Sequence, residues 1–170
     1  MEQDWELAGS KIVYFSPLAD EPVPKSDFIY LPGGYPELYA GQLAKNKTFL
    51  ESVRSASKEI NVYGECGGYM VLGETLIDKA GQSHKMLNLL DLVTSIEKPN
   101  LTLGYRKLTS ISTPFKGTFT GHEFHYARTL KANGKKLFTT RDASDNSLPN
   151  LGLVKGRVSG SFAHIIDRYK

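Results

Sequence analysis

The chain has 170 residues, 40% of them hydrophobic, which is enough for one globular domain with a substantial core. Its 21 basic and 18 acidic residues are spread along the sequence, so the net charge of +3 indicates a solvated surface and argues against a nucleic-acid partner. A single cysteine cannot form an internal disulfide, and there is neither a signal peptide nor an apolar run long enough to cross a bilayer. We therefore expect a cytoplasmic protein with no membrane partner.

The first part of the chain has the pattern of a parallel sheet with a crossover helix. Residues 11–15 and 27–31 are apolar runs of the kind found in buried parallel strands. Residues 38–58 follow a helical pattern with Asn46 as a candidate N-cap after a break, and residues 60–63 return as a strand. In such sheets the ligand binds beyond the carboxyl ends of the strands, so the loops that follow these strands are the expected place for a site.

The later part of the chain has the closer spacing of antiparallel strands and hairpins. The expected elements are short segments at 75–78 and 84–87, strands at 91–97, 101–112 and 117–130, a polar loop at 141–150 and a strand-like run at 151–164.

The sharpest local motif surrounds the only cysteine, in Gly64-Glu65-Cys66-Gly67-Gly68. Glycines two residues either side of Cys66 match the thiol version of the nucleophile elbow, in which a strand turns sharply into a helix. The free amides and the dipole of a helix start favour negative charge and can lower a thiol pKa. The motif predicts Cys66 as a nucleophile; the alternative is a small buried hydrophobic residue.

A second glycine motif, Pro32-Gly33-Gly34, ends the strand at 27–31. Adjacent glycines at the carboxyl end of a strand can aim backbone N–H groups at an oxyanion. We expect Gly33 and Gly34, together with Gly67 after the nucleophile, to bind the substrate amide and its oxyanion. A plain tight turn is the alternative.

Histidines supply the candidate base. His164 ends a strand-like run of small residues, and a neutral imidazole there could take the proton of Cys66; the alternative is a packed histidine. His122 and His125 do not have the H-E-x-x-H spacing of a zinc helix, and residues three apart on a strand point to opposite faces, so no metal site is expected. His84, in a polar turn, is expected at the surface.

Four motifs together resemble the glutamine amidotransferase domain of the cobyrinic acid a,c-diamide synthase family: Leu31-Pro32-Gly33-Gly34-Tyr35-Pro36-Glu37-Leu38, Gly64-Glu65-Cys66-Gly67-Gly68, Leu103-Gly104-Tyr105-Arg106 and Gly121-His122-Glu123-Phe124-His125-Tyr126. The resemblance implies a three-layer, flavodoxin-like α/β fold of class I with a mixed, mainly parallel sheet. It also implies that Cys66 attacks the amide of glutamine, that His164 is the base, and that ammonia passes to an ATP-dependent synthetase site that amidates corrin carboxylates.

The resemblance carries further expectations. Residues 1–170 would be a single domain, a C-terminal fragment without the N-terminal synthetase domain and without the first strand and helix of its own domain, and the isolated fragment would be a weak glutaminase. No cofactor is expected in this domain, whereas ATP and Mg²⁺ would bind the synthetase domain. The partners would be glutamine, that synthetase domain and its corrin substrate. His122, Glu123 and His125 are candidate interface residues, with a purely structural strand as the alternative.

One position departs from the class. A glutamate two residues after the histidine orients it in the wider class I enzymes, but Ile166 stands there in this chain. The group that orients His164 therefore stays unidentified at this point. Besides the glutaminase, two other hypotheses remain, another cysteine hydrolase on the same fold and a non-catalytic docking module.

Overall fold

The structure is a computed structural model and describes residues 2–112 and 114–169. Its helices are α1 (Glu2–Leu7), α2 (Ala40–Leu43), α3 (Lys47–Ala56) and α4 (Gly67–Leu72), with 3-10 turns at Pro17–Ala19 and Pro36–Tyr39. Its strands are β1 (Phe28–Leu31), β2 (Asn61–Glu65), β3 (Thr75–Ile77), β4 (Ser83–Lys85), β5 (Leu92–Ser95), β6 (Thr102–Ser110), β7 (Gly117–His125), β8 (Arg128–Ala132), β9 (Phe138–Arg141), β10 (Ser147–Leu151), β11 (Leu153–Lys155), β12 (Val158–Ser161) and β13 (His164–Arg168).

The central sheet has the strand order β1-β2-β12-β11, in which β1, β2 and β12 are parallel and β11 is antiparallel to β12. Leu31 at the end of β1 pairs with Gly64, and Glu65 at the end of β2 pairs with Ser161. The carboxyl ends of the parallel strands therefore share one edge. As the sequence predicts, the loop after β1 and the Cys66 turn both begin at this edge.

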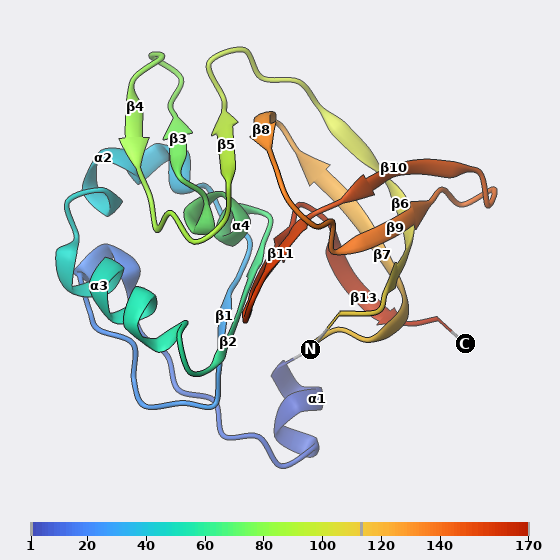
Figure 1. The fold of residues 1–170 in the computed structure, drawn as a ribbon, viewed down its shortest axis with the longest axis horizontal. Coiled ribbons are helices and arrows are strands. Elements are labelled where there is room, and N and C mark those ends of the chain that lie inside the picture. Colours follow the sequence, from blue (N-terminus) through green and yellow to red (C-terminus); the bar gives the residue numbers. More distant parts are fainter. Residues whose placement is uncertain (1, 113, 170) are drawn as a thin grey trace.

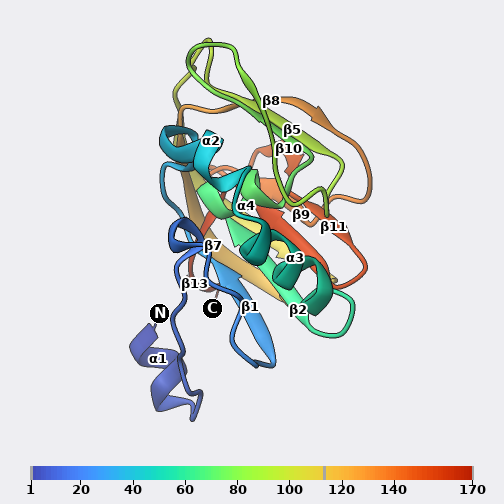
Figure 2. The same cartoon turned by 90° about the vertical axis from the view of Figure 1, so that its left-hand side faces the viewer.

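Alternating side chains of the central sheet face two separate cores. Ile29 and Val62 belong to the larger core, on the side covered by α3 and α4. Tyr63 belongs to the other core and packs with Leu108 and Phe138 of a five-stranded antiparallel sheet, ordered β10-β9-β6-β7-β13. Figure 1 shows α2 and α3 on one side of β1 and β2 and the antiparallel sheet on the other. Figure 2 views the molecule from the helical side, with α3 and α4 in front of β2.

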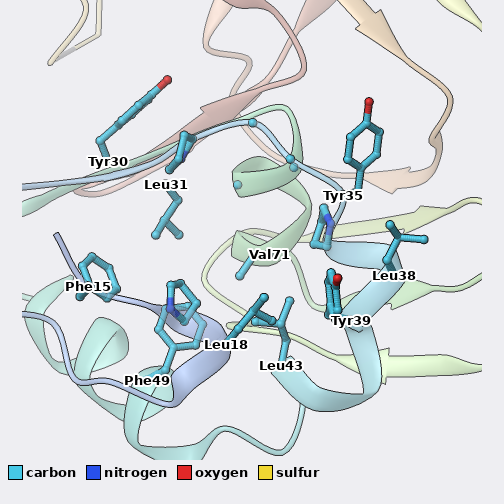
Figure 3. A pocket seen from close by; sticks show the side chains of 17 residues that line it. Phe15, Leu18, Tyr30, Leu31, Tyr35, Leu38, Tyr39, Leu43, Phe49 and Val71 are labelled. Carbon is cyan, nitrogen blue, oxygen red and sulfur yellow. The ribbon is translucent and has the colours of Figure 1, made fainter. Parts of the chain in front are cut away.

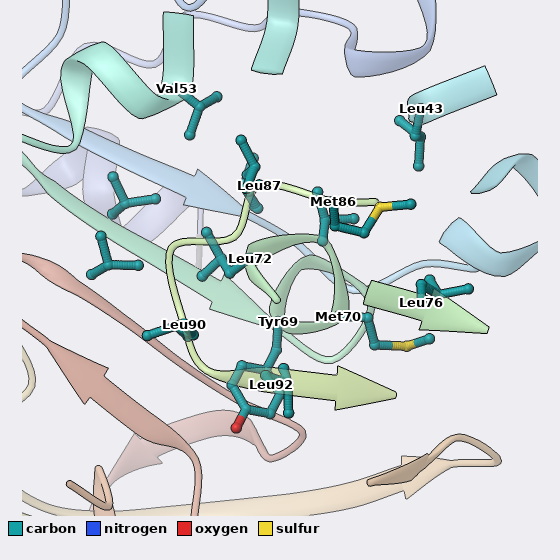
Figure 4. Packing of buried hydrophobic residues seen from close by; sticks show 14 of the residues in the cluster. Leu43, Val53, Tyr69, Met70, Leu72, Leu76, Met86, Leu87, Leu90 and Leu92 are labelled. Atoms are coloured by element: carbon teal, nitrogen blue, oxygen red, sulfur yellow. The ribbon is translucent and has the colours of Figure 1, made fainter. Parts of the chain in front are cut away.

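A third sheet, ordered β4-β3-β5-β8, extends the helical side of the fold. The segment that leads into β5 packs on α4, where Leu72 is fully buried and lies between Leu87 and Leu90 (Figure 4). Arg54 of α3 donates hydrogen bonds to the carbonyl oxygens of Leu87 and Met86, both at 3.0 Å. These bonds satisfy backbone groups that burial would otherwise leave unpaired.

The predicted mixed α/β fold is confirmed, with one difference in its composition. In the described part of the chain, parallel pairing occurs in β1–β2, β2–β12 and β3–β5, and the antiparallel pairs are more numerous. The antiparallel sheet covers the face where a second helical layer was expected. Short connections produce this arrangement, because β7 begins soon after β6 ends and β10 soon after β9, which permits hairpins, whereas a parallel crossover needs a dozen or more residues.

One local prediction in the first part of the chain was wrong, and another is confirmed in part. Residues 11–15 form no strand; Phe15 instead packs against Phe49, with ring centroids 6.3 Å apart. The helical segment at 38–58 is broken before Asn46, as the sequence predicts, and Asn46 is the N-cap residue of α3. Its side chain, however, donates to the carbonyl oxygen of Pro17 at 2.7 Å and makes no cap bond. This hydrogen bond ties the start of α3 to the loop before β1.

Two later predictions also need correction. The polar loop expected at 141–150 is shorter, since residues 147–151 pair with β9 as β10. His84 is not a surface residue: it is 9% exposed, and its Nε2 lies 2.7 Å from the Oδ2 of Asp78. This hydrogen bond lowers the pKa of Asp78. Among the described residues, no helix has both the length and the apolar character needed to cross a membrane.

Candidate active site

Cys66 lies on a strained turn between β2 and α4. Its φ of 50° and ψ of −105° are unusual for a residue with a Cβ, and such outliers cluster at functional sites. The N–H of Cys66 donates to the carbonyl oxygen of Ser161 at 2.8 Å, and the N–H of Gly68 donates to that of Pro32 at 3.0 Å. Hydrogen bonds to β12 and to the end of β1 therefore hold the turn on both sides, as in the predicted elbow.

The loop after β1 touches the start of α4 so closely that side chains are excluded. A Cβ on Gly68 would lie 2.0 Å from the carbonyl oxygen of Leu31, and a Cβ on Gly67 would lie 2.5 Å from that of Gly34. The same Cβ on Gly67 would lie 2.9 Å from the backbone nitrogen of Gly34. The two backbone amides predicted as oxyanion donors therefore belong to neighbouring segments of the structure, beside the nucleophile.

His164 is the first residue of β13 and lies over the same loop. A Cβ on Gly33 would lie 2.8 Å from Cε1 of His164 and 3.5 Å from Cβ of Cys66. The predicted nucleophile, base and oxyanion loop thus meet at one point. A hydrogen bond with Cys66, and after it one with Glu65, raises the pKa of His164 to about 10, against the opposing effect of burial. At neutral pH this places a protonated imidazole beside the thiol.

Glu65 is a site residue that sequence reasoning missed. It is only 4% exposed, and its Oε1 lies 3.0 Å from Nδ1 of His164. Oε1 also accepts a hydrogen bond from the hydroxyl of Tyr30 at 2.9 Å, and Oε2 accepts one from the backbone N–H of Ile165 at 3.2 Å. One signal was available in the sequence: a charged residue at the end of a buried parallel strand, directly before the nucleophile, needs a specific partner.

The three candidate interface residues of β7 do not share one face. The ring of His122 stacks on that of His164, with centroids 5.0 Å apart and planes at 12°. Glu123 and His125 point to the opposite face, because alternate residues of a strand do so. There His125 Nε2 lies 3.2 Å from Glu123, and Nε of Arg106 donates to Glu123 at 2.7 Å. His122 therefore stacks on the candidate base, whereas Glu123 and His125 form a hydrogen-bonded network with Arg106 on the other face.

The side-chain chemistry of that network agrees with a structural role. Burial by itself would raise the pKa of Glu123, but the hydrogen bonds with His125 and Arg106 lower it overall. The ring of His125 also stacks on Phe162, with centroids 4.0 Å apart. This stacking holds β7 to the chain just before β13, while Nδ1 of His125 lies 3.0 Å from the carbonyl oxygen of Ala127.

A pocket of about 480 Å³ lies behind the Gly33-Gly34 loop. Figure 3 shows Phe15, Leu18 and Phe49 pointing into the pocket, while Tyr35 points away from it. Its lining includes Gly33, Gly34 and Gly67 but neither Cys66 nor His164, and its other side chains are almost all apolar. The pocket therefore borders the backbone of the Gly33-Gly34 loop, and the side chains of Cys66 and His164 do not line it.

Known proteins place this arrangement in a family. A family model for the CobB/CobQ-like glutamine amidotransferase domain matches residues 6–169. The chain is 48% identical over 169 residues to a hydrogenobyrinate a,c-diamide synthase of Brucella anthropi, and 44% identical over 172 residues to one of Rhodobacter capsulatus. These alignments cover 97% and 98% of this chain, but the chain spans only 39% of the length of either relative.

A solved structure supports the fold independently. A crystal structure of a glutamine amidotransferase aligns with a TM-score of 0.53 at 16% identity, over 81% of this chain and 70% of the other. The family match spans the elbow, the loop after β1 and His164, and it covers far more than half of the chain. The chain therefore belongs to the family of CobB/CobQ-like glutamine amidotransferase domains.

Proposed function

We propose that this chain is the glutaminase part of an ATP-dependent a,c-diamide synthase that amidates a corrin in cobalamin biosynthesis. One observation carries the proposal: Cys66, His164 and the Gly33-Gly34 loop meet at the carboxyl edge of the parallel strands. A thiol, an imidazole and backbone amides in this arrangement suit acyl transfer from an amide.

The first step would release ammonia. The Cys66 thiolate adds to the carboxamide carbon of glutamine, and the N–H groups of Gly34 and Gly67 stabilise the oxyanion. Each such donor contributes on the order of 3 kcal/mol to lowering the barrier. The protonated His164 donates its proton to the nitrogen as the carbon–nitrogen bond breaks, which leaves a thioester and ammonia.

The second step would regenerate the thiolate. Neutral His164 takes a proton from water as the water oxygen adds to the thioester carbon. Collapse of this adduct breaks the carbon–sulfur bond and releases glutamate, with the thiolate and the imidazolium restored. Neither step requires a metal or a cofactor, so ATP and Mg²⁺ would serve the synthetase part of the enzyme.

The names of the relatives support the choice of corrin. Both relatives are called hydrogenobyrinate a,c-diamide synthases, so we take hydrogenobyrinate, or a closely related corrin acid, as the acceptor. Because the chain spans 39% of their length, the acceptor site and the ATP site would belong to a synthetase part. ATP supply favours the cytoplasm as the compartment.

An exposed face beside the site suits docking of that synthetase part. Four large side chains on one face of the β6-β7 hairpin are 50% to 71% exposed: Leu103, Tyr105, Phe124 and Tyr126. His122, which pairs with Tyr105, joins this face to His164. Exposed apolar patches mark interaction sites, and a partner here would lie beside His122 and His164, where the proposed reaction releases ammonia. In the enzyme with its synthetase part, Phe124→Lys should abolish glutamine-dependent but not ammonium-dependent synthesis, whereas Leu130→Lys on β8 should retain both.

A glutamine-analogue diazo-ketone tests the chemistry. Since Cys66 is the only cysteine, alkylation by a general thiol reagent reports on it alone. We expect the diazo-ketone to label Cys66 and glutamine to protect it, with no labelling in Cys66→Ala. Labelling by general thiol reagents alone would indicate another cysteine hydrolase, and a thiol with ordinary reactivity would indicate a docking module.

A further inference from the structure

We propose that Glu65 is the residue that positions His164, so that the nucleophile and the carboxylate that orients its base are consecutive in the chain. The inference rests on the proposed function and deepens it. It supplies the group that the class I pattern places two residues after the histidine, where this chain has Ile166.

The strand geometry explains how neighbouring residues reach one imidazole. Glu65 and Tyr63 lie on the face of β2 that packs against the antiparallel sheet, and His164 lies in that sheet. The chain then turns sharply at Cys66, whose positive φ takes its side chain off the strand. Glu65 contacts Nδ1 of His164 at 3.0 Å, which leaves Nε2 for the thiol.

The carboxylate of Glu65 is itself held in place. Its two oxygens accept hydrogen bonds from the Tyr30 hydroxyl at 2.9 Å and from the N–H of Ile165 at 3.2 Å. The second bond comes from the residue directly after His164, so one carboxylate holds both the ring and the backbone of β13. Trp5 of α1 packs edge-on against Tyr30, with centroids 5.4 Å apart.

Neither Ile166, at the position of the class I glutamate, nor the next residue, Asp167, is available for this role. Ile166 is 56% exposed, and the exposed Asp167 accepts a hydrogen bond from the N–H of Arg168 at 2.7 Å. The titratable groups that face His164 in the described residues are Cys66, Glu65 and the stacked His122. Of these, Glu65 alone brings a carboxylate to the ring.

The consequence is a defined tautomer. A carboxylate at Nδ1 keeps the proton on that nitrogen, so Nε2 is free to receive the proton of the Cys66 thiol and later to give it to ammonia. It also stabilises the imidazolium that forms. Without the carboxylate charge, the imidazole ring should be less well oriented and the thiolate of Cys66 beside it should be less stable.

The test replaces the charge and keeps the shape. For Glu65→Gln we expect kcat for glutamine hydrolysis to fall on the order of 100-fold, with KM within about threefold of wild type. The pH midpoint of Cys66 alkylation by iodoacetamide should rise by about one unit or more. Glu123→Gln is the matched control, because it makes the same change at another buried carboxylate that bonds a histidine, and its alkylation midpoint should stay at the wild-type value.

A second readout needs no change at Glu65. In Cys66→Ala, nitrogen NMR should find neutral His164 protonated at Nδ1; a proton on Nε2 would overturn the proposal even if Glu65→Gln does not fold. An alkylation midpoint and a kcat in Glu65→Gln that both stay at the wild-type values would overturn it as well. Alkylation and the tautomer do not involve glutamine, so they decide the role of Glu65 even if the chain hydrolyses another substrate.

Discussion

Gly33→Ala is a perturbation whose effect can be worked out from the structure. The new Cβ would lie 2.8 Å from Cε1 of His164, whereas ordinary contact begins at 3.4 Å. The imidazole would therefore have to retreat by about 0.6 Å, because the backbone on either side of Gly33 is packed against α4. The φ of Gly33 lies outside the left-handed region, so alanine adds no backbone strain there.

The displacement translates into a rate. A misplacement of about 1 Å can cost on the order of 100-fold, so a shift of about 0.6 Å should lower kcat between about 10- and 100-fold. His164 cannot move away from the new methyl group freely, because Glu65 holds both its Nδ1 and the backbone N–H of Ile165. The unfolding free energy should change by less than about 1 kcal/mol, since the clash falls on a partly exposed ring.

The assay compares two alanine variants that each face a histidine. Gly41→Ala places its Cβ 3.5 Å from Cε1 of His84, an ordinary contact far from Cys66 along the fold, and should leave glutamate release and Cys66 alkylation unchanged. Gly33→Ala should slow both. Equal rates for the two variants, with equal melting temperatures, would show that His164 does not need its observed position and would refute the assigned base.

Three further predictions concern the surroundings of the site. The pKa of His164 is raised to about 10 in the folded protein, with the hydrogen bond to Cys66 as the largest cause. The stability contributed by its protonation is therefore complete below the unfolded pKa of about 6.5 and is lost as pH rises through about 10. Urea titrations of Cys66→Ala should show that loss at a lower pH. In the enzyme with its synthetase part, His122→Ala should uncouple glutamine hydrolysis from amide formation, whereas His125→Ala should lower the free energy of unfolding. An unchanged ratio of amide formed to glutamine hydrolysed in His122→Ala would contradict the proposed interface with the synthetase part. Leu72 is fully buried, so Leu72→Ala should lower the free energy of unfolding in urea by about 2–5 kcal/mol. A smaller loss would mean that neighbouring side chains move in to fill the cavity.

The sequence alone predicted the parts of the site that depend on neighbouring residues. The glycines around Cys66 and the Gly33-Gly34 pair specify backbone conformations, and those conformations are local. The strand 28–31 was predicted for a similar reason, since its continuous apolar run is typical of a buried parallel strand. The edge at which the two loops meet then follows from parallel pairing.

Tertiary structure decided what depends on distant partners. The strand expected at 11–15 failed because a strand needs a hydrogen-bonded neighbour, and Phe15 found an aromatic partner in α3 instead. The antiparallel sheet took the place of a helical layer because its hairpins could close over Tyr63 and its neighbours.

The role of Glu65 shows most clearly what could not be predicted from the sequence. Its position at the end of a buried strand, beside Cys66, indicates that it needs a partner, but that partner, His164, is 99 residues away and cannot be identified locally. Only the packing of β13 across the end of β2 brings the imidazole to the carboxylate. The nucleophile could be predicted because a turn is made by adjacent residues, whereas the orientation of its base had to wait for the fold, because a buried charge is defined by what surrounds it.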